Sequence, residues 1–169
     1  MTETFVVSPA FRIVSGGQTG ADLAGLDWAL DNGVAHGGWC PKGRRSEDGP
    51  IDGRYHLVET PNANYLQRTE WNVRDSDATV IFTMDNKLEG GSRRTADFAE
   101  KLGKPWIHIR AGVDPKYLAR FLASKNVLTL NVAGKRESAQ PGVYLFTRKV
   151  LNEVLSLEVK QAHGGADGS

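Results

Sequence analysis

The stretch "FRIVSGGQTGADLAG", residues 11–25, decides the fold class. It begins with a short apolar run at residues 12–15 and leads through a glycine-rich turn into a segment with helical spacing at residues 22–32. A short apolar run is typical of a buried strand, and Gly33 is a suitable end for the helix. The stretch therefore predicts a strand, a glycine turn and a helix, in that order.

The same alternation continues along the chain. The segment 78–83, "ATVIFT", is almost entirely apolar, as expected of a strand covered on both faces. Strands that alternate with helices indicate a parallel sheet with right-handed crossovers. We predict an α/β, Rossmann-like fold with a parallel sheet of about five or more strands and helices on both faces. Its further strands are expected at 34–39, 55–59, 78–83, 106–109 and 127–132, and its further helices at 61–74, 95–102, 114–125 and 142–158.

Length and composition narrow the classes of function. A chain of 169 residues is the size of one domain, which we place at 1–158, with a polar, glycine-rich flexible tail at 159–169. The 21 Lys and Arg residues nearly balance the 20 Asp and Glu residues, so the net charge of +1 predicts neither nucleic acid nor an anionic membrane as a partner. We find neither a secretion signal nor a membrane-spanning run. The single Cys40 cannot form an internal disulfide, which favours the cytoplasm.

The first glycine turn is a candidate anion site. Ligands of open parallel sheets bind beyond the carboxyl ends of the strands, which directs attention to the loops after Val14, Ile81 and Leu130. In the first of these loops, Gly16 and Gly17 would let an anion approach backbone amides at the start of a helix. The pattern is neither a dinucleotide fingerprint nor a P-loop, and an ordinary tight turn with a capped helix is the alternative.

Three other loops have a similar character. A second glycine pair, Gly90 and Gly91, follows the strand at 78–83 and precedes Arg93 and Arg94. Either arginine could pair with an anion, although solvated surface arginines are the simpler alternative. The polar segment 39–45 and the turn after the strand at 127–132 are also rich in glycine and cations. A solvated loop explains each of them singly, but together they predict a shared binding cleft.

The histidines predict no catalytic site. His36, His56 and His108 are scattered, and none has the spacing of a nucleophile–base pair or of a metal motif. We predict no catalytic residue and no metal ligand. The helical edge formed by Arg68, Asn72 and Asp75 is explained by ordinary helix-surface chemistry.

Four long motifs resemble one known family. "IVSGGQTGADLAGLDWAL" (13–30), "HGGWCPKGRRSEDGPI" (36–51), "QRTEWNVRDSDATVIF" (67–82) and "LNVAGKRES" (130–138) together resemble the molybdenum-cofactor carrier proteins over about residues 12–155. The resemblance implies a homo-oligomeric, dimeric or tetrameric Rossmann-like protein. It would bind, protect and deliver the molybdenum cofactor, a phosphate-bearing pterin with a dithiolene-bound metal. Its implied partners are molybdoenzymes or cofactor-biosynthesis proteins.

The same fold group includes the lysine-decarboxylase-like phosphoribohydrolases. Their PGGxGTxxE motif is similar to "EGGSRRTADF" here, but Phe98 stands where the catalytic glutamate would fall, with Asp97 as a shifted substitute. A nucleotide-binding sensor or a nucleoside-monophosphate phosphoribohydrolase is therefore the alternative function. The predicted cofactor-binding residues are Gly16, Gly17, Gln18, Thr19, Gly20, Asp22, Lys42, Gly43, Arg44, Arg45, Gly90, Gly91, Ser92, Thr95, Asn131 and Gly134.

Overall fold

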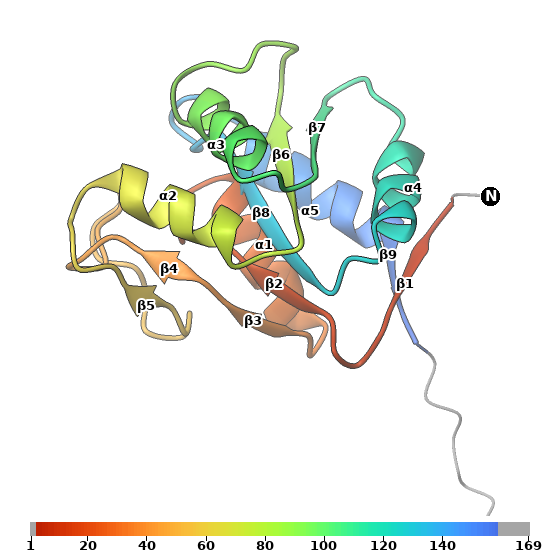
Figure 1. The fold of residues 1–169 in the computed structure, drawn as a ribbon, viewed down its shortest axis with the longest axis horizontal. Helices are drawn as coiled ribbons and strands as arrows, with labels where there is room; N and C mark the ends of the chain where they lie inside the picture. Colours follow the sequence, from red (N-terminus) through yellow and green to blue (C-terminus); the bar gives the residue numbers. More distant parts are fainter. Residues whose placement is uncertain (1–2, 159–169) are drawn as a thin grey trace, which may run out of the picture.

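A parallel sheet forms the centre of the computed structural model, which describes residues 3–158 (Figure 1). Within this range the sheet has five strands in the order β3-β2-β8-β6-β7, and every neighbouring pair is parallel. This confirms the predicted α/β, Rossmann-like class. The strands are β2 (Arg12–Val14), β3 (Ala35–Gly37), β6 (Ala78–Thr83), β7 (Trp106–Arg110) and β8 (Thr129–Gly134).

Helices cover both faces of this sheet (Figure 1). In the view of Figure 1, α1 (Ala21–Asp31) and α5 (Val143–Val154) lie behind the sheet, and α2 (Tyr65–Arg74) and α3 (Gly90–Lys101) lie in front of it. The helices of each pair also pack against each other. The remaining helix of the described chain, α4 (Lys116–Ser124), packs near β1 and β7.

Two small sheets lie outside the central one. β1 (Phe5–Val7) pairs in parallel with β9 (Leu155–Leu157), and β4 (Trp39–Cys40) pairs with β5 (Val58–Glu59). Neither strand of the first pair was predicted. The sequence predicts one helix over 142–158, but α5 ends at Val154 because the next three residues pair with β1 instead.

The predicted strand 34–39 is divided at Gly38. This residue has a φ of +125°, and a Cβ there would lie 2.4 Å from the carbonyl oxygen of Ser15. The chain bends away at this point, and β3 and β4 therefore belong to different sheets.

Two helices begin at residues that the spacing does not predict. The sequence predicts a helix from 95, but α3 begins at Gly90 because the Ser92 hydroxyl accepts from the Glu89 amide at 3.3 Å and donates to its carbonyl at 2.8 Å. These bonds cap the first turn despite its glycines. The helix predicted from 61 begins at Tyr65, where the Asn64 side chain accepts from the Leu66 amide.

Two further predictions concern membrane-spanning segments and the tail at 159–169. Within residues 3–158, no helix is long and apolar enough to cross a membrane. The predicted flexible tail, residues 159–169, lies outside the described residues.

The core places the first helix very close to the sheet. β6 is buried along its whole length between β8 and β7, as expected of an interior strand. On one face of the sheet, α1 approaches β8 at Gly25. An added Cβ there would lie 2.8 Å from both Cβ and Cγ1 of Val132. This close approach holds the amino-terminal end of α1 at the sheet edge.

We expect Gly25→Ala to lower the free energy of unfolding by roughly 1–3 kcal/mol, because the added methyl group overpacks the contact with Val132. The overpacking outweighs the gain in helix propensity, which favours Ala over Gly by about 1 kcal/mol. Urea unfolding measures the change. Gly53→Ala is the matched control, since a Cβ there meets nothing within 4 Å, and its effect should stay within about 0.5 kcal/mol. Equal or greater stability of Gly25→Ala would contradict the packing described for α1.

Candidate functional site

Three adjacent strands end at the same edge of the sheet and bring their loops together. β8 lies between β2 and β6, so the loops after Val14, Thr83 and Gly134 meet at the carboxyl edge. A cavity of about 210 Å³ opens there, and α2 closes its remaining side. It is lined by Gln18, Asp22, Arg68, Thr69, Gly90, Gly91, Ser92, Thr95, Ala133, Gly134, Lys135, Arg136 and Ala139.

This cavity continues into two neighbouring spaces. One of about 270 Å³ is also lined by Gln18, Arg68, Gly91 and Arg136, and adds other residues of α2 and α3. A narrow one of about 10 Å³ extends from the base and reaches Asn131. We call the three spaces together the carboxyl-edge cleft. Its position agrees with the usual ligand site of open parallel sheets.

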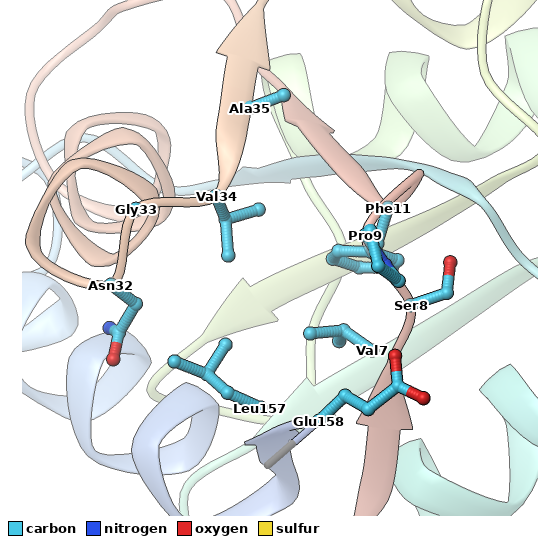
Figure 2. Close-up of a pocket in the computed structure, with 10 residues that line it drawn as sticks. All are labelled: Val7, Ser8, Pro9, Phe11, Asn32, Gly33, Val34, Ala35, Leu157 and Glu158. Carbon is cyan, nitrogen blue, oxygen red and sulfur yellow. The ribbon is translucent and has the colours of Figure 1, made fainter. Parts of the chain in front are cut away.

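A larger cavity lies elsewhere in the described chain. It has a volume of about 410 Å³ and lies at the opposite edge of the sheet, where the strands begin (Figure 2). Phe11 directly precedes β2, and Ala35 is the first residue of β3. Figure 2 shows apolar side chains, including Val7, Val34 and Leu157, around this space. Of the described residues that line it, only Glu158 is ionisable. Because binding sites require converging polar groups, the smaller cleft is the better candidate.

An ion pair forms the base of the cleft. Arg68 Nη1 lies 3.4 Å from Asp22 Oδ2, and their side chains are 17% and 6% exposed. The same carboxylate oxygen accepts from the Gln18 amide at 3.2 Å. Asp22 is in the first turn of α1 and Arg68 is on α2, so the pair joins elements on opposite faces of the sheet.

Gly16 makes room for this arginine. A Cβ at residue 16 would lie 2.2 Å from Nη1 and 2.9 Å from Cδ of Arg68, so the guanidinium rests directly on the glycine backbone. The guanidinium carbon also lies 5.5 Å from the ring centre of Tyr65. The side chain is therefore held across the cleft base.

Burial dominates the ionisation of both partners. It raises the pKa of Asp22 to about 6, although the charge of Arg68 and the amides of Gln18 and Gly16 act in the opposite direction. Burial also lowers the pKa of Arg68. The single contact at 3.4 Å is too weak to offset the loss of hydration of the carboxylate.

The rim of the cleft is positively charged. Gly90 and Gly91 open α3, a Cβ at either meets nothing within 4 Å, and their amides donate to no residue in the described chain. Lys135 Nζ donates to the carbonyl of Glu89 at 2.8 Å, beside this helix start. Arg94 and Arg136 line the 270 Å³ space next to it. Free amides at a helix start and three nearby cations make this rim suitable for an anion.

The first glycine loop differs from its prediction. The amides of Gly17 and Gln18 are already bonded to Ser15 Oγ and Asp22 Oδ2. Gly17 packs under Ile51 and Leu57, and a Cβ at Gly20 would lie 2.3 Å from the Lys135 carbonyl. These two glycines permit close packing of neighbouring loops, and the amides of Gly17 and Gln18 are not free for an anion.

Thr19 and Gln18 fasten the first loop to its neighbours. Thr19 Oγ1 donates to Glu47 and accepts from the Glu137 amide. Gln18 Nε2 donates to the carbonyl of Arg45 at 3.0 Å. The first loop is thus joined to both the 41–57 segment and the loop after β8.

The predicted cations of the 39–45 segment do not line the described cleft. Arg44 donates to the carbonyls of four residues in its own loop, Ile51, Asp52, Tyr55 and Leu57. The Gly43 amide donates to Glu59 at 2.6 Å, and Lys42 and Arg45 are likewise outside the lining. Arg44 therefore stabilises the fold of this loop.

Other predicted residues do come together. Gln18, Asp22, Gly90, Gly91, Ser92, Thr95 and Gly134 line the 210 Å³ cavity, and Gly16 and Asn131 line its narrow extension. Asn131 Nδ2 donates to Thr79 Oγ1 at 3.2 Å, which orients its amide at the base. Whether these residues bind a ligand stays a prediction.

Several residues that line the cleft are not among the predicted cofactor-binding residues. Arg68 and Asn72 were attributed to a helix surface, but both face inward, and Asn72 is hydrogen-bonded to the backbone of Trp39 through both ends of its amide. Trp39 itself packs edge-on against Trp71 and donates to Asp75, away from the cleft. Their place within the motif at 67–82 could have indicated this role. Thr69 was also missed, whereas Lys135 and Arg136 are the cations of the turn after the predicted strand at 127–132.

The remaining candidate groups lie apart from the cleft. Cys40 is buried, and burial raises the pKa of its thiol. His36 and His56 stack on each other with ring centres 5.4 Å apart. Among residues 3–158, no group of three or more His, Cys, Asp and Glu side chains is placed to hold a metal ion.

The fold defines an α/β domain of Rossmann-like type with a polar cleft at the carboxyl edge of its sheet. The sequence matches the model of the circularly permutated YpsA SLOG family over residues 13–155. The chain belongs to this family. A crystal structure from Syntrophus aciditrophicus SB, of a protein named "putative molybdenum carrier protein", is 41% identical with a TM-score of 0.83, and the match covers 88% of this chain and 97% of that one. These two matches confirm the resemblance found in the sequence.

Weaker matches add no argument about function. A structure of (E)-4-hydroxy-3-methyl-but-2-enyl diphosphate reductase is 12% identical with a TM-score of 0.38, covering 85% of this chain and 59% of that one. The corresponding reductase from Plasmodium falciparum is 10% identical with a TM-score of 0.36, covering 94% and 59%. No curated protein matches the chain.

We expect Asp22 to make stability decrease as the pH rises from about 4 to about 6. Its folded-state pKa of about 6 lies above the ordinary value of 3.8, so between these values the folded state binds a proton that the unfolded state has lost. Loss of this proton costs up to roughly 3 kcal/mol of unfolding free energy. Urea unfolding of the wild type and Asp22→Asn across this range measures the contribution as the difference between the two profiles. Parallel profiles would contradict it.

Proposed function

We propose that this protein binds the molybdenum cofactor in the carboxyl-edge cleft, and protects and delivers it without turning it over. The observation that carries the proposal is the meeting of a free helix start, three cations and a buried polar base in one cleft. The name of the Syntrophus aciditrophicus relative supports the choice of cargo. In this proposal the cofactor is cargo, and no bond of it is broken.

The phosphate of the cofactor would bind at the rim. The amides of Gly90 and Gly91 provide hydrogen-bond donors, and Lys135 lies against the same helix start. Arg94 and Arg136 add charge from the two sides of the adjoining space. Of the two glycine turns predicted as anion sites, the second suits the phosphate better, because the amides of Gly17 and Gln18 in the first are already bonded.

The pterin would occupy the interior of the cleft. Its walls are Gln18 and Asp22 from one side and Ser92 and Thr95 from the other, with Asn131 at the base. Gly16, Gly17, Thr19 and Gly20 would act indirectly, by holding the first loop and Arg68 in place. Gly134 would let β8 end close to β6, because a Cβ there would lie 2.1 Å from the Phe82 carbonyl.

The 41–57 segment would support the first loop from outside the cleft. It is held against the first loop by Gln18, which bonds to Arg45, and by Glu47, which accepts from Thr19 and Ser138. The hydroxyl groups of Ser138 and Thr19 keep the pKa of Glu47 below its usual range, so the carboxylate is charged at neutral pH. We propose Lys42, Gly43, Arg44 and Arg45 as residues that shape this supporting segment.

Assembly and location stay predictions. We expect a dimer or tetramer, a cytoplasmic protein, and molybdoenzymes or cofactor-biosynthesis proteins as recipients or donors of the cargo. Light scattering of the purified full chain tests the first of these expectations.

We expect the wild type to retain molybdenum cofactor, and Arg94→Gln/Arg136→Gln to bind it at least roughly tenfold more weakly, a loss of about 1.4 kcal/mol or more. The cofactor would be released anaerobically from a molybdoenzyme and added to the protein. After gel filtration, retained molybdenum is measured by mass spectrometry and pterin by fluorescence after oxidation. Arg93→Gln is the matched control, because Arg93 pairs with Asp97 on α3 and does not line the described cleft. The proposal is wrong if the wild type retains no more than the double variant.

We expect no release of free base when the protein is incubated with nucleoside monophosphates. The phosphoribohydrolase alternative requires a carboxylate near the ribose, but the Asp97 side chain is 55% exposed and pairs with Arg93 at 3.2 Å, outside the lining of the described cleft. Chromatography of the reaction mixture measures the base. Release that is abolished by Asp97→Ala would replace the carrier function with hydrolysis, whereas saturable nucleotide binding without product would favour a sensor.

A further inference from the structure

The acid at the base of the cleft is only half used by the protein. Asp22 Oδ2 accepts from the Gln18 amide at 3.2 Å and from Arg68 at 3.4 Å, both long contacts. Both of these bonds end on Oδ2, and Oδ1 accepts none from the described residues, although the Gly16 amide is near enough to favour the charged carboxylate. A carboxylate has about four acceptor positions, so Asp22 keeps spare capacity while it lines the cavity.

The guanidinium of Arg68 also has hydrogen-bond donors that the protein does not use. A guanidinium has five N–H donors, and the one hydrogen bond that Arg68 makes within the described residues is the contact to Asp22. Its Nε is buried without a partner. Arg68 lines all three spaces of the cleft, so its remaining N–H donors border the cleft.

This geometry is unusual for a pair with a purely structural role. Burying two charges is costly, and a structural Arg–Asp pair offsets that cost best with two parallel hydrogen bonds. Here Arg68 rests on Gly16, lies near the Tyr65 ring, and reaches Asp22 through one nitrogen. The arrangement leaves an acceptor group beside a donor group, both bordering the same cavity.

A flat ring with the opposite pattern on one edge would satisfy both groups. The carbonyl of a 2-amino-4-oxopyrimidine accepts hydrogen bonds, and its ring N–H and exocyclic amino group donate two in parallel. Pterins and guanine share this edge. Adenine and cytosine instead present one amino group beside an acceptor nitrogen, and hypoxanthine lacks the amino group.

We propose that Asp22 and Arg68 recognise the 2-amino-4-oxopyrimidine edge of the ligand, with the ring N–H and amino group donating to Asp22 and the carbonyl accepting from Arg68. For a pterin cargo this rests on the proposed function, and it deepens it by assigning the direction of binding. The pyrimidine edge faces the base of the cleft, and the phosphate arm faces Arg94, Arg136 and the start of α3. No covalent step is involved.

Electrostatics supports this direction. The carboxylate of Asp22 would repel a phosphate at the base, whereas the rim carries Lys135, Arg136 and Arg94. Burial raises the pKa of Asp22 in the free protein, although Arg68 and two backbone amides act in the opposite direction. A ligand that donates two hydrogen bonds to it would stabilise the charged form.

Calorimetric titration of the full chain with neopterin monophosphate, GMP, IMP and AMP tests the proposal. We expect the first two to bind, IMP to bind several-fold more weakly than GMP, and AMP to bind at least tenfold more weakly. Asp22→Asn should reduce the GMP-to-AMP ratio of affinities to about one. Asp97→Asn, a matched change on the exposed face of α3, should preserve the ratio. If Asp22→Asn does not fold, as judged by circular dichroism, the wild-type ratios decide the matter.

The outcomes separate this inference from the proposed function. Equal binding of GMP and AMP by the wild type, or no binding of GMP and neopterin monophosphate at millimolar concentration, overturns the inference. Retention of molybdenum cofactor that Asp22→Asn leaves unchanged also overturns it, while the carrier function stands. Preference for GMP that depends on Asp22, without retention of molybdenum, supports the inference and contradicts the carrier function.

Discussion

The parallel pairing of β8 with both β2 and β6 is the constraint on which the site depends. Because all three strands run in the same direction, three loops from distant parts of the sequence meet at one edge. The pairing requires very close packing at its ends, where Gly134 approaches the Phe82 carbonyl and Gly20 approaches the Lys135 carbonyl. Larger residues at these two positions would separate the loops, and the cleft would lose its base and rim together.

The glycine loops perform different tasks although their sequences look alike. In the first loop, glycines allow neighbouring chain segments to touch, and the amides of Gly17 and Gln18 have partners within the protein. In the second loop, Gly90 and Gly91 face open space at the start of α3. The chemistry of an anion site therefore depends on what covers a glycine, which the local sequence does not reveal.

The sequence predicted the fold well because its signals are local. Alternating apolar and helical segments indicated the parallel sheet, and the buried run at 78–83 became β6 with the expected bounds. Since strand ends identify the loops, it also selected Gln18, Asp22 and Thr95, which the fold brings into one cavity. Element ends were less predictable, as at α5, where pairing with β1 depends on residues about 150 positions away.

Arg68 shows why the rest of the site could not be predicted. Its position on α2 is compatible with a solvated face, and apart from its place within the motif at 67–82, nothing nearby in the sequence indicates that it points inward. The direction follows from the packing of α2 against the first loop, where Gly16 leaves room for the guanidinium. Arg44 is the reverse case, since its charge suggested ligand contact but its four carbonyl partners lie within its own loop.

The pairing of β1 with β9 also affects how the chain is made. During translation, Phe5–Val7 leaves the ribosome about 150 residues before its strand partner, Leu155–Leu157. An apolar strand with an unpaired edge must therefore wait until the intervening residues have been synthesised, which exposes it to wrong pairing with other nascent chains. This small sheet can close only after the central sheet has been synthesised.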